Sequence, residues 1–187
     1  PKDISGFAKW LDPIVDLLLE MEKIKPFSEE YNIADRMLQR INEWSEMPIR
    51  KNLLSLKDKE KISDLIERNR PKIAVCFNHA DFVPWHMHKI AFPKLALVDY
   101  ENCKNKPRYY DLAYFYQRVY TKLDEPKLAD NFLELYKKMA KLPADFDERF
   151  LPVLGQRIIG GFYDNIVLKD KTDIKVHQRL LKIIFPD

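Results

Sequence analysis

Two acidic residues that each follow a short β-like run are the strongest chemical signal in this chain. Asp81 lies in the stretch 79–86 (His-Ala-Asp-Phe-Val-Pro-Trp-His), which comes after the apolar run 72–77, and Asp99 follows the run 94–98. We expect the ends of two adjacent strands to deliver both carboxylates into one crevice. Such a pair suits phosphoryl transfer. One carboxylate can orient or deprotonate a hydroxyl, while the other holds the magnesium ion that neutralises the phosphates.

Three short motifs around these residues resemble those of a known family. The motifs are His79-Ala80-Asp81, Val98-Asp99-Tyr100-Glu101 and Tyr110-Asp111-Leu112-Ala113. They are similar to the His-Gly-Asp, Ile-Asp-Trp/Phe-Glu and Tyr-Asp-Leu-Ala motifs of the aminoglycoside phosphotransferase and choline kinase superfamily. Members of that superfamily are small-molecule kinases with a protein-kinase-like fold. Each motif alone is weak, but their joint order and spacing make the resemblance sharp over residues 71–120.

The resemblance implies a role for each acidic residue. Asp81 would be the catalytic base or the group that orients the hydroxyl, and Asp99 would hold the metal ion. His79 would support the catalytic loop through backbone hydrogen bonds, and Asp111 would brace the same loop from the start of a helix. The expected cofactors are ATP and Mg²⁺ (or Mn²⁺). The expected substrate is an aminoglycoside-, choline- or sugar-like alcohol.

Two departures from the family pattern limit this reading. The family has a metal-binding Asn five residues after the catalytic Asp, and this chain has His86 there. Magnesium prefers oxygen ligands, whereas manganese accepts nitrogen more readily. The second departure is the lack of a Gly-rich loop followed by a strand with a phosphate-binding Lys. We therefore expect the N-terminal nucleotide-binding lobe to be absent and residues 1–187 alone to be inactive.

The substrate-binding residues are predicted only from their types. Glu101, Tyr109 and Tyr110 lie close in sequence to the site and would suit a cationic amine, through ion pairing and cation–π contact. Arg108 occupies a position where choline and ethanolamine kinases commonly have Arg.

Two alternatives remain open from the sequence. His79, Asp81, His86, His88 and Asp99 could together ligate zinc or manganese, as in a metallohydrolase. Alternatively, the chain could be a degenerate, non-catalytic kinase-like module that binds a ligand or a partner protein. The histidine at the Asn position favours this second alternative.

Length, composition and charge indicate a globular protein and argue against nucleic-acid and membrane partners. The chain has 187 residues, of which 46% are hydrophobic and 33% charged, and a net charge of +3; these values are ordinary for a globular protein with a real core. Basic residues alternate with acidic ones, so we expect no nucleic-acid partner. No apolar run approaches the roughly 18 residues that span a bilayer, so we expect no membrane partner. Cys76 and Cys103 form no metal motif or disulfide framework, which favours a cytoplasmic location.

The resemblance and the hydrophobic spacing together predict the architecture. The expected fold is mainly α (α+β): the helical C-terminal lobe of a protein-kinase-like fold, with one or two short β-hairpins carrying the catalytic and metal-binding loops. We expect a single domain over 1–187, helical over 1–70 and 101–187, with the catalytic and metal-binding β region at 71–100. The expected helices are 4–22 with a restart at Asp12-Pro13, Ser28 to just before Pro48, 57–69, 111–123, one beginning at Pro126, 145–166 with a bend or close approach at Gly160-Gly161, and one from a Thr172 cap to Phe185.

Overall fold

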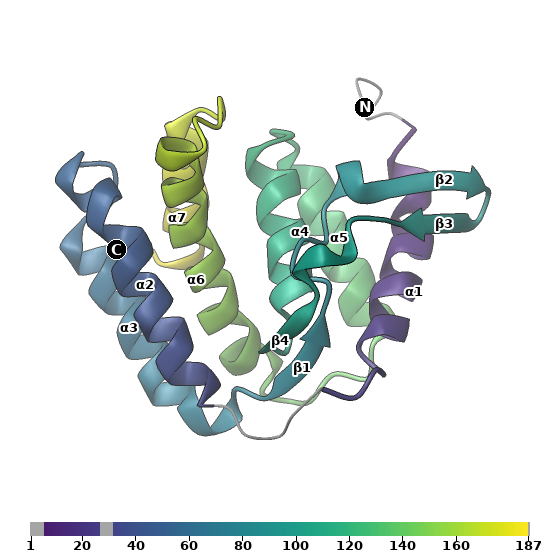
Figure 1. The fold of residues 1–187 in the computed structure, drawn as a ribbon, viewed down its shortest axis with the longest axis horizontal. Helices are drawn as coiled ribbons and strands as arrows, with labels where there is room; N and C mark the ends of the chain where they lie inside the picture. The colour runs from purple at the N-terminus through teal and green to yellow at the C-terminus, as the bar shows by residue number, and fades with distance from the viewer. Residues whose placement is uncertain (1–5, 27–31, 187) are drawn as a thin grey trace.

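The computed structural model describes residues 6–26 and 32–186, and this part of the chain is mainly α-helical (Figure 1). None of its helices combines the length and apolar character needed to cross a membrane. The α-helices are α1 (Leu11–Met21), α2 (Ile33–Arg50), α3 (Leu56–Asn69), α4 (Tyr110–Thr121), α5 (Pro126–Met139), α6 (Phe146–Val167) and α7 (Ile174–Ile184). The strands are β1 (Val75–Asn78), β2 (Met87–Ala91), β3 (Lys94–Leu97) and β4 (Lys104–Pro107).

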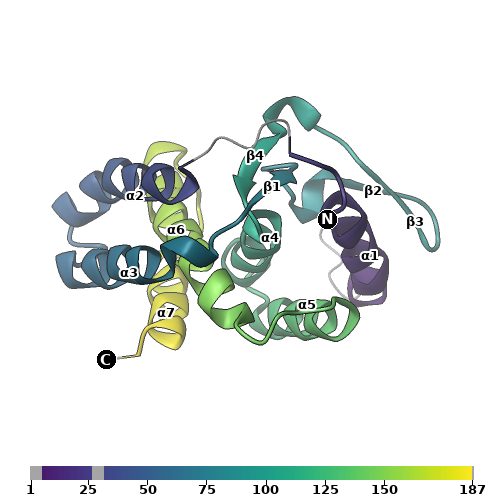
Figure 2. The same ribbon diagram turned by 90° about the horizontal axis from the view of Figure 1, so that it is seen from below.

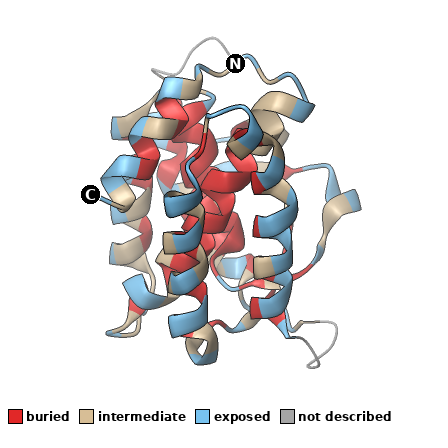
Figure 3. Ribbon diagram, turned by 90° about the vertical axis from the view of Figure 1, so that its left-hand side faces the viewer, coloured by how far each residue is buried: buried red, intermediate tan, exposed pale blue. Residues whose placement is uncertain are grey.

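The helices form two groups on either side of β1 and β4. Helices α2, α3, α6 and α7 lie on one side, and α1, α4 and α5 lie on the other with β2 and β3 (Figures 1 and 2). Helix α6 contacts α2, α3, α4 and α7, so it joins the two groups. Buried residues follow the helix faces that point inward, and exposed residues follow the outer faces (Figure 3). Segments far apart in the sequence therefore meet around β1 and β4.

The strands pair differently from the expectation. β1 pairs antiparallel with β4, with Asn78 opposite Lys104, whereas β2 and β3 form a separate hairpin. The predicted runs 72–77 and 94–98 therefore belong to two different sheets, and the expectation that they are adjacent strands was wrong. The reason is that the hairpin lies inside the long connection between β1 and β4. Pairing of β1 with β4 brings the two ends of this connection together.

Helices α3 and α6 show how the local sequence sets a helix end and a close approach between helices. Ser55 caps α3, where its Oγ accepts a hydrogen bond from the Asp58 N–H at 3.0 Å. The predicted stretch 145–166 is one helix, α6. A Cβ on Gly161 would lie 2.7 Å from both Gln117 Nε2 and His177 Cε1. This helix approaches its neighbours closely at a glycine, as predicted.

Three helix ends differ from the prediction. Helix α2 continues through Pro48, whose ring is buried. In the last turn of a helix, a missing N–H costs one hydrogen bond at most. Asp12 lies in the first turn of α1 instead of capping a restart, since the 3₁₀ turn Ala8–Trp10 leads directly into that helix. Asp173, not Thr172, caps α7 through the Lys175 N–H. The predicted start at Ser28 lies outside the described residues.

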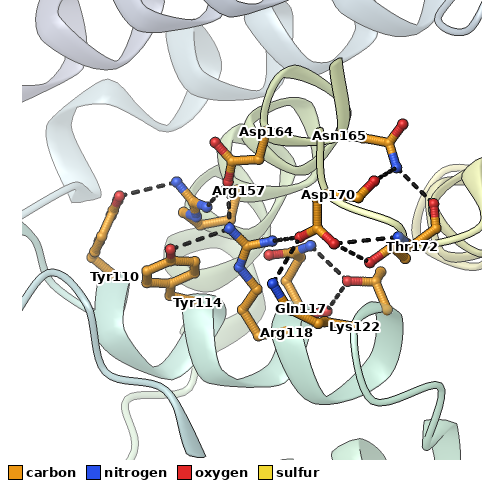
Figure 4. Close-up of polar contacts among 11 residues, drawn as sticks. Tyr110, Tyr114, Gln117, Arg118, Lys122, Arg157, Asp164, Asn165, Asp170 and Thr172 are labelled. Atoms are coloured by element: carbon orange, nitrogen blue, oxygen red, sulfur yellow. Dashed lines mark hydrogen bonds and ion pairs between the residues drawn. The ribbon is translucent and has the colours of Figure 1, made fainter. Parts of the chain in front are cut away.

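A buried polar network joins α4, α6 and the segment before α7 (Figure 4). Arg118 of α4 forms ion pairs with Asp164 at 2.5 Å and Asp170 at 3.3 Å. Arg157 of α6 donates to the Tyr110 hydroxyl at 3.1 Å. Because buried charges are costly unless they are paired, these contacts strongly favour one relative placement of the two helices. The N-terminus of α4, which carries Asp111, is thereby held against α6.

His177 of α7 gives this region a predictable pH dependence. The imidazole is 1% exposed, and burial, together with the nearby Arg118, lowers its pKa to about 4. Below the unfolded-state pKa near 6.5, the unfolded chain binds a proton that the folded protein does not. This group should therefore make the free energy of unfolding fall as pH decreases from about 6.5 towards 4, by about 2 kcal/mol between pH 7 and pH 5.

Urea denaturation of the wild type and His177→Gln at the two pH values measures this contribution. The variant should lose the corresponding part of the pH dependence, since Gln does not titrate. His88→Gln is the matched control, because His88 is exposed in β2. Equal pH slopes in the wild type and His177→Gln would contradict the assignment.

Candidate active site

The loop after β1 is held by one carboxylate. The backbone N–H groups of His79 and Ala80 donate to the two oxygens of Asp111 at 2.7 and 2.9 Å. Asn78 completes the arrangement, since its Oδ1 accepts a hydrogen bond from the Asp111 N–H at 3.2 Å. Burial raises the pKa of Asp111 to about 7, although the two donors act in the opposite direction. The first turn of α4 therefore determines the shape of the loop that carries Asp81.

The backbone of Ala80 is strained at the point where this loop turns. Its φ is 64°, in the left-handed region that an alanine adopts at a cost and a glycine adopts freely. The family motif has Gly at this position. The hydrogen bond to Asp111 holds Ala80 in this conformation, so the chain keeps the turn without the glycine.

His79 connects the Asp81 loop to the segment that carries Asp99. Its ring is completely buried, and its Nε2 lies 3.0 Å from the carbonyl oxygen of Val98. A carbonyl can only accept, so Nε2 carries the proton and donates. Burial lowers the pKa of His79, which keeps the imidazole neutral. The geometry thus gives His79 a supporting contact between two loops, and places it outside the group of possible metal ligands.

Asp81, His86 and Asp99 converge at one place. Each offers a ligand atom within 4.8 Å of the others, and they form the one such group of His, Cys, Asp and Glu found among the described residues. His86 lies between the carboxylates, with Nδ1 3.6 Å from Asp81 Oδ2 and Nε2 3.3 Å from Asp99 Oδ2. The side chains are 24%, 17% and 38% exposed, in chain order. The cluster is therefore anchored in the fold and open to solvent.

Backbone contacts settle which nitrogen of His86 is available. Nδ1 lies 3.0 Å from the carbonyl oxygen of Asp81, which can only accept, so Nδ1 carries the proton in the neutral ring. The lone pair of Nε2 then faces Asp99 Oδ2. Two lone pairs at 3.3 Å repel each other unless a proton or a metal cation lies between them. A positive charge between His86 and Asp99 would remove this repulsion.

Other predicted residues lie away from this cluster. His88 is exposed on β2, opposite Ala96, and is not part of the metal-ligand group. The five-residue metallohydrolase site is therefore not formed in the described structure, since His79 and His88 both fall outside the group. Glu101 is exposed in the short turn after Asp99.

Tyr109 and Tyr110 are core residues. They are 3% and 4% exposed, and the Tyr110 hydroxyl accepts a hydrogen bond from Arg157. Tyr109 packs edge-on against Phe146, with ring centroids 5.1 Å apart. Arg108 lies 3.5 Å from the buried carboxylate of Glu22. Both tyrosine rings therefore point into the interior, where they do not offer the predicted contact with substrate.

Asn78 also positions the loop after β1, although none of the three motifs includes it. Its side chain links the end of β1 to the N-terminus of α4, as described above, and its Nδ2 donates to the Cys76 carbonyl at 3.0 Å. A polar residue at the end of an apolar strand, directly before the first motif, was the available signal.

Replacing Asp111 tests the brace. In Asp111→Asn, the amide has one acceptor oxygen and one donor NH₂, so the N–H of His79 or of Ala80 loses its acceptor. We expect the free energy of unfolding in urea to fall by roughly 1–3 kcal/mol. Asp16→Asn, at an exposed position of α1, is the matched control and should leave stability unchanged. Equal stability of Asp111→Asn and the wild type would rule out the brace.

Comparison with known proteins agrees with this geometry. A model described as the phosphotransferase enzyme family matches residues 8–149, which include the whole region from α1 to the start of α6. A comparison with curated proteins gave no significant match. The family match covers most of the chain and contains Asp81, His86, Asp99 and Asp111. The resemblance to aminoglycoside phosphotransferases and choline kinases is confirmed, and the chain belongs to the phosphotransferase enzyme family.

Proposed function

We propose that this chain carries the catalytic and metal-binding loops of an ATP-dependent phosphotransferase, which transfers the γ-phosphate to a hydroxyl of a small molecule. The convergence of Asp81 and Asp99 on one partly exposed imidazole supports this proposal most directly. Asp81 would accept the proton of the acceptor hydroxyl at a carboxylate oxygen, or orient that hydroxyl for attack. The neighbouring Phe82 is completely buried against Phe115, with ring centroids 5.8 Å apart, and it anchors Asp81.

The donor set fits a divalent cation. Asp99 supplies carboxylate oxygens, and His86 supplies an Nε2 lone pair aimed at Asp99. Magnesium would depend chiefly on Asp99 and water, whereas manganese also accepts the imidazole nitrogen. When bound, the ion supplies positive charge to the transferring phosphates. The fixed Nδ1–H donor holds the imidazole in the orientation that this role requires.

A second candidate function rests on the same histidine. If His86 is protonated on both nitrogens, it forms ion pairs with Asp81 and Asp99 and occupies the place of a metal ion. The chain would then be a non-catalytic kinase-like module that binds a ligand or partner. Metal binding separates the two functions, because a protonated imidazole offers no lone pair.

Calorimetric titration with Mn²⁺ and Mg²⁺ tests the proposed metal site. We expect the wild type to bind Mn²⁺ more tightly than Mg²⁺, and His86→Asn to bind Mg²⁺ roughly tenfold more tightly than the wild type, since Asn supplies an oxygen. Asp99→Asn should bind neither ion measurably. His88→Asn, the matched control on β2, should behave as the wild type. Equal Mg²⁺ affinity in the wild type and His86→Asn would favour the binding module.

ATP binding gives a separate prediction. The chain has four glycines, at positions 6, 155, 160 and 161, and none belongs to a phosphate-binding loop. Because positioning and electrostatic clamping supply most of the catalysis in this chemistry, residues 1–187 alone should bind ATP weakly and transfer no measurable phosphate to amines or sugars. Release of ADP measures transfer. Turnover that Asp81→Asn abolishes would contradict this expectation and would support the role of Asp81.

A further inference from the structure

A basic hollow lies between α2, β4 and α6. It is separate from the group of Asp81, His86 and Asp99, called the acidic cluster below. Its volume is about 260 Å³, and its charged lining consists of Arg36, Arg40, Lys104 and Lys106. Among the described residues, no acidic side chain lines it. A cavity of this size accepts a small molecule, or one end of a larger one, but not a polymer.

Lys106 is the innermost charge of this hollow. Its Nζ lies 4.8 Å from the centroid of the Tyr110 ring, and the guanidinium of Arg157 lies 5.5 Å from the same centroid. Burial, together with the charges of Lys104, Arg157 and Arg40, lowers the pKa of Lys106 to about 8, and Asp111 opposes this effect. Partial burial of Lys106 near the buried Arg157 costs free energy, so an anion bound beside Lys106 would relieve a cost that the folded protein already carries.

Arg40 lines the hollow from α2, and its guanidinium lies 5.9 Å from the centroid of the Trp44 ring. It is exposed on α2, and its guanidinium pairs with Glu43, one turn along the helix, at 2.9 Å. An exposed ion pair of this kind contributes little free energy. Exchanging Glu43 for an anion in the hollow would therefore cost little.

Gln156 of α6 adds a neutral polar group to the lining. It is 4% exposed, and its Nε2 donates to the Met37 carbonyl at 3.4 Å. Its Oε1 is buried and has no hydrogen-bond partner among the described residues. A ligand hydroxyl that reached this oxygen would satisfy it, since an unpaired buried oxygen is costly.

The hollow is close to the loop that carries Asp81. Lys104 pairs with Asn78 across β4 and β1, and Asn78 directly precedes His79. Figure 1 shows β4 between α6 and β1, next to the end of β1 from which this loop departs. A molecule held in the hollow by one end could thus extend towards the acidic cluster.

We infer that this hollow binds the oxyanion of a small hydroxylated molecule, either a phosphate or a carboxylate. If the proposed phosphotransferase function is correct, on which this step rests, that molecule is the acceptor. An amine such as choline would meet like charges here, so the basic lining argues against the cationic substrate expected from residue types.

Calorimetric titration with inorganic phosphate and with malonate, in dilute buffer freed of metal ions by a chelating resin, tests this inference. Lys106→Met keeps the aliphatic stem and removes the charge, and Arg40→Ala removes the rim guanidinium. Each should weaken binding roughly tenfold or more, as expected for the loss of a charge-assisted hydrogen bond. The matched controls, Lys137→Met on α5 and Arg50→Ala on α2, should bind as the wild type does. The tighter probe identifies the anion as phosphate or carboxylate.

Three results would overturn the inference. The first is no binding of either oxyanion by the wild type at millimolar concentration. The second is unchanged binding in Lys106→Met and Arg40→Ala, with urea denaturation confirming that both variants are folded. The third is loss of phosphate binding in Asp99→Asn without metal, which would place the anion at the acidic cluster. Phosphate binding that depends on Lys106, in a protein that binds no Mn²⁺, would support the hollow and contradict the proposed function.

Discussion

The candidate site depends on the carboxylate of Asp111, which accepts the backbone N–H groups of His79 and Ala80. The buried carboxylate of Asp111 requires hydrogen-bond donors, and the left-handed conformation of Ala80 requires a stabilising contact. The hydrogen bond between them meets both requirements. Asp111 is in turn placed by α4, which α6 holds through Arg118 and Arg157. A polar network remote from the chemistry therefore positions the loop that carries Asp81.

Two further hydrogen bonds connect that loop to the segments that carry His86 and Asp99. His79 bonds the carbonyl of Val98, and the Val98 N–H donates to the carbonyl of His86 at 3.0 Å. The segments before Asp99 and around His86 are therefore tied to the same support as Asp81. The bond between Val98 and His86 involves only backbone groups, so it does not depend on the side chain at position 86.

Local sequence patterns predicted much of the fold and the central site. The helix at 111–123 and the close approach at Gly160-Gly161 follow from signals within short windows, whereas the convergence of Asp81 with Asp99 was expected from the motifs and their spacing. Features that depend on distant contacts were missed. The pairing of β1 with β4 is decided by tertiary packing. Tyr109 and Tyr110 lie beside the site in sequence, but packing of α4 against other elements turns them inward.

The composition does not reveal that folding gathers basic and acidic residues into two separate regions. A net charge of +3 with interspersed lysines and acids suggests an even surface, yet folding gathers basic residues from α2 and β4 into one hollow and three metal-ligand candidates into one acidic cluster. The two regions make opposite demands: the acidic cluster attracts a cation, and the hollow attracts an anion. A molecule with an oxyanion at one end and a hydroxyl at the other meets both conditions, since the hydroxyl carries no charge for Asp81 to repel. Under the proposed function, the field around β4 would select the orientation in which such a molecule presents its hydroxyl to the loop that carries Asp81.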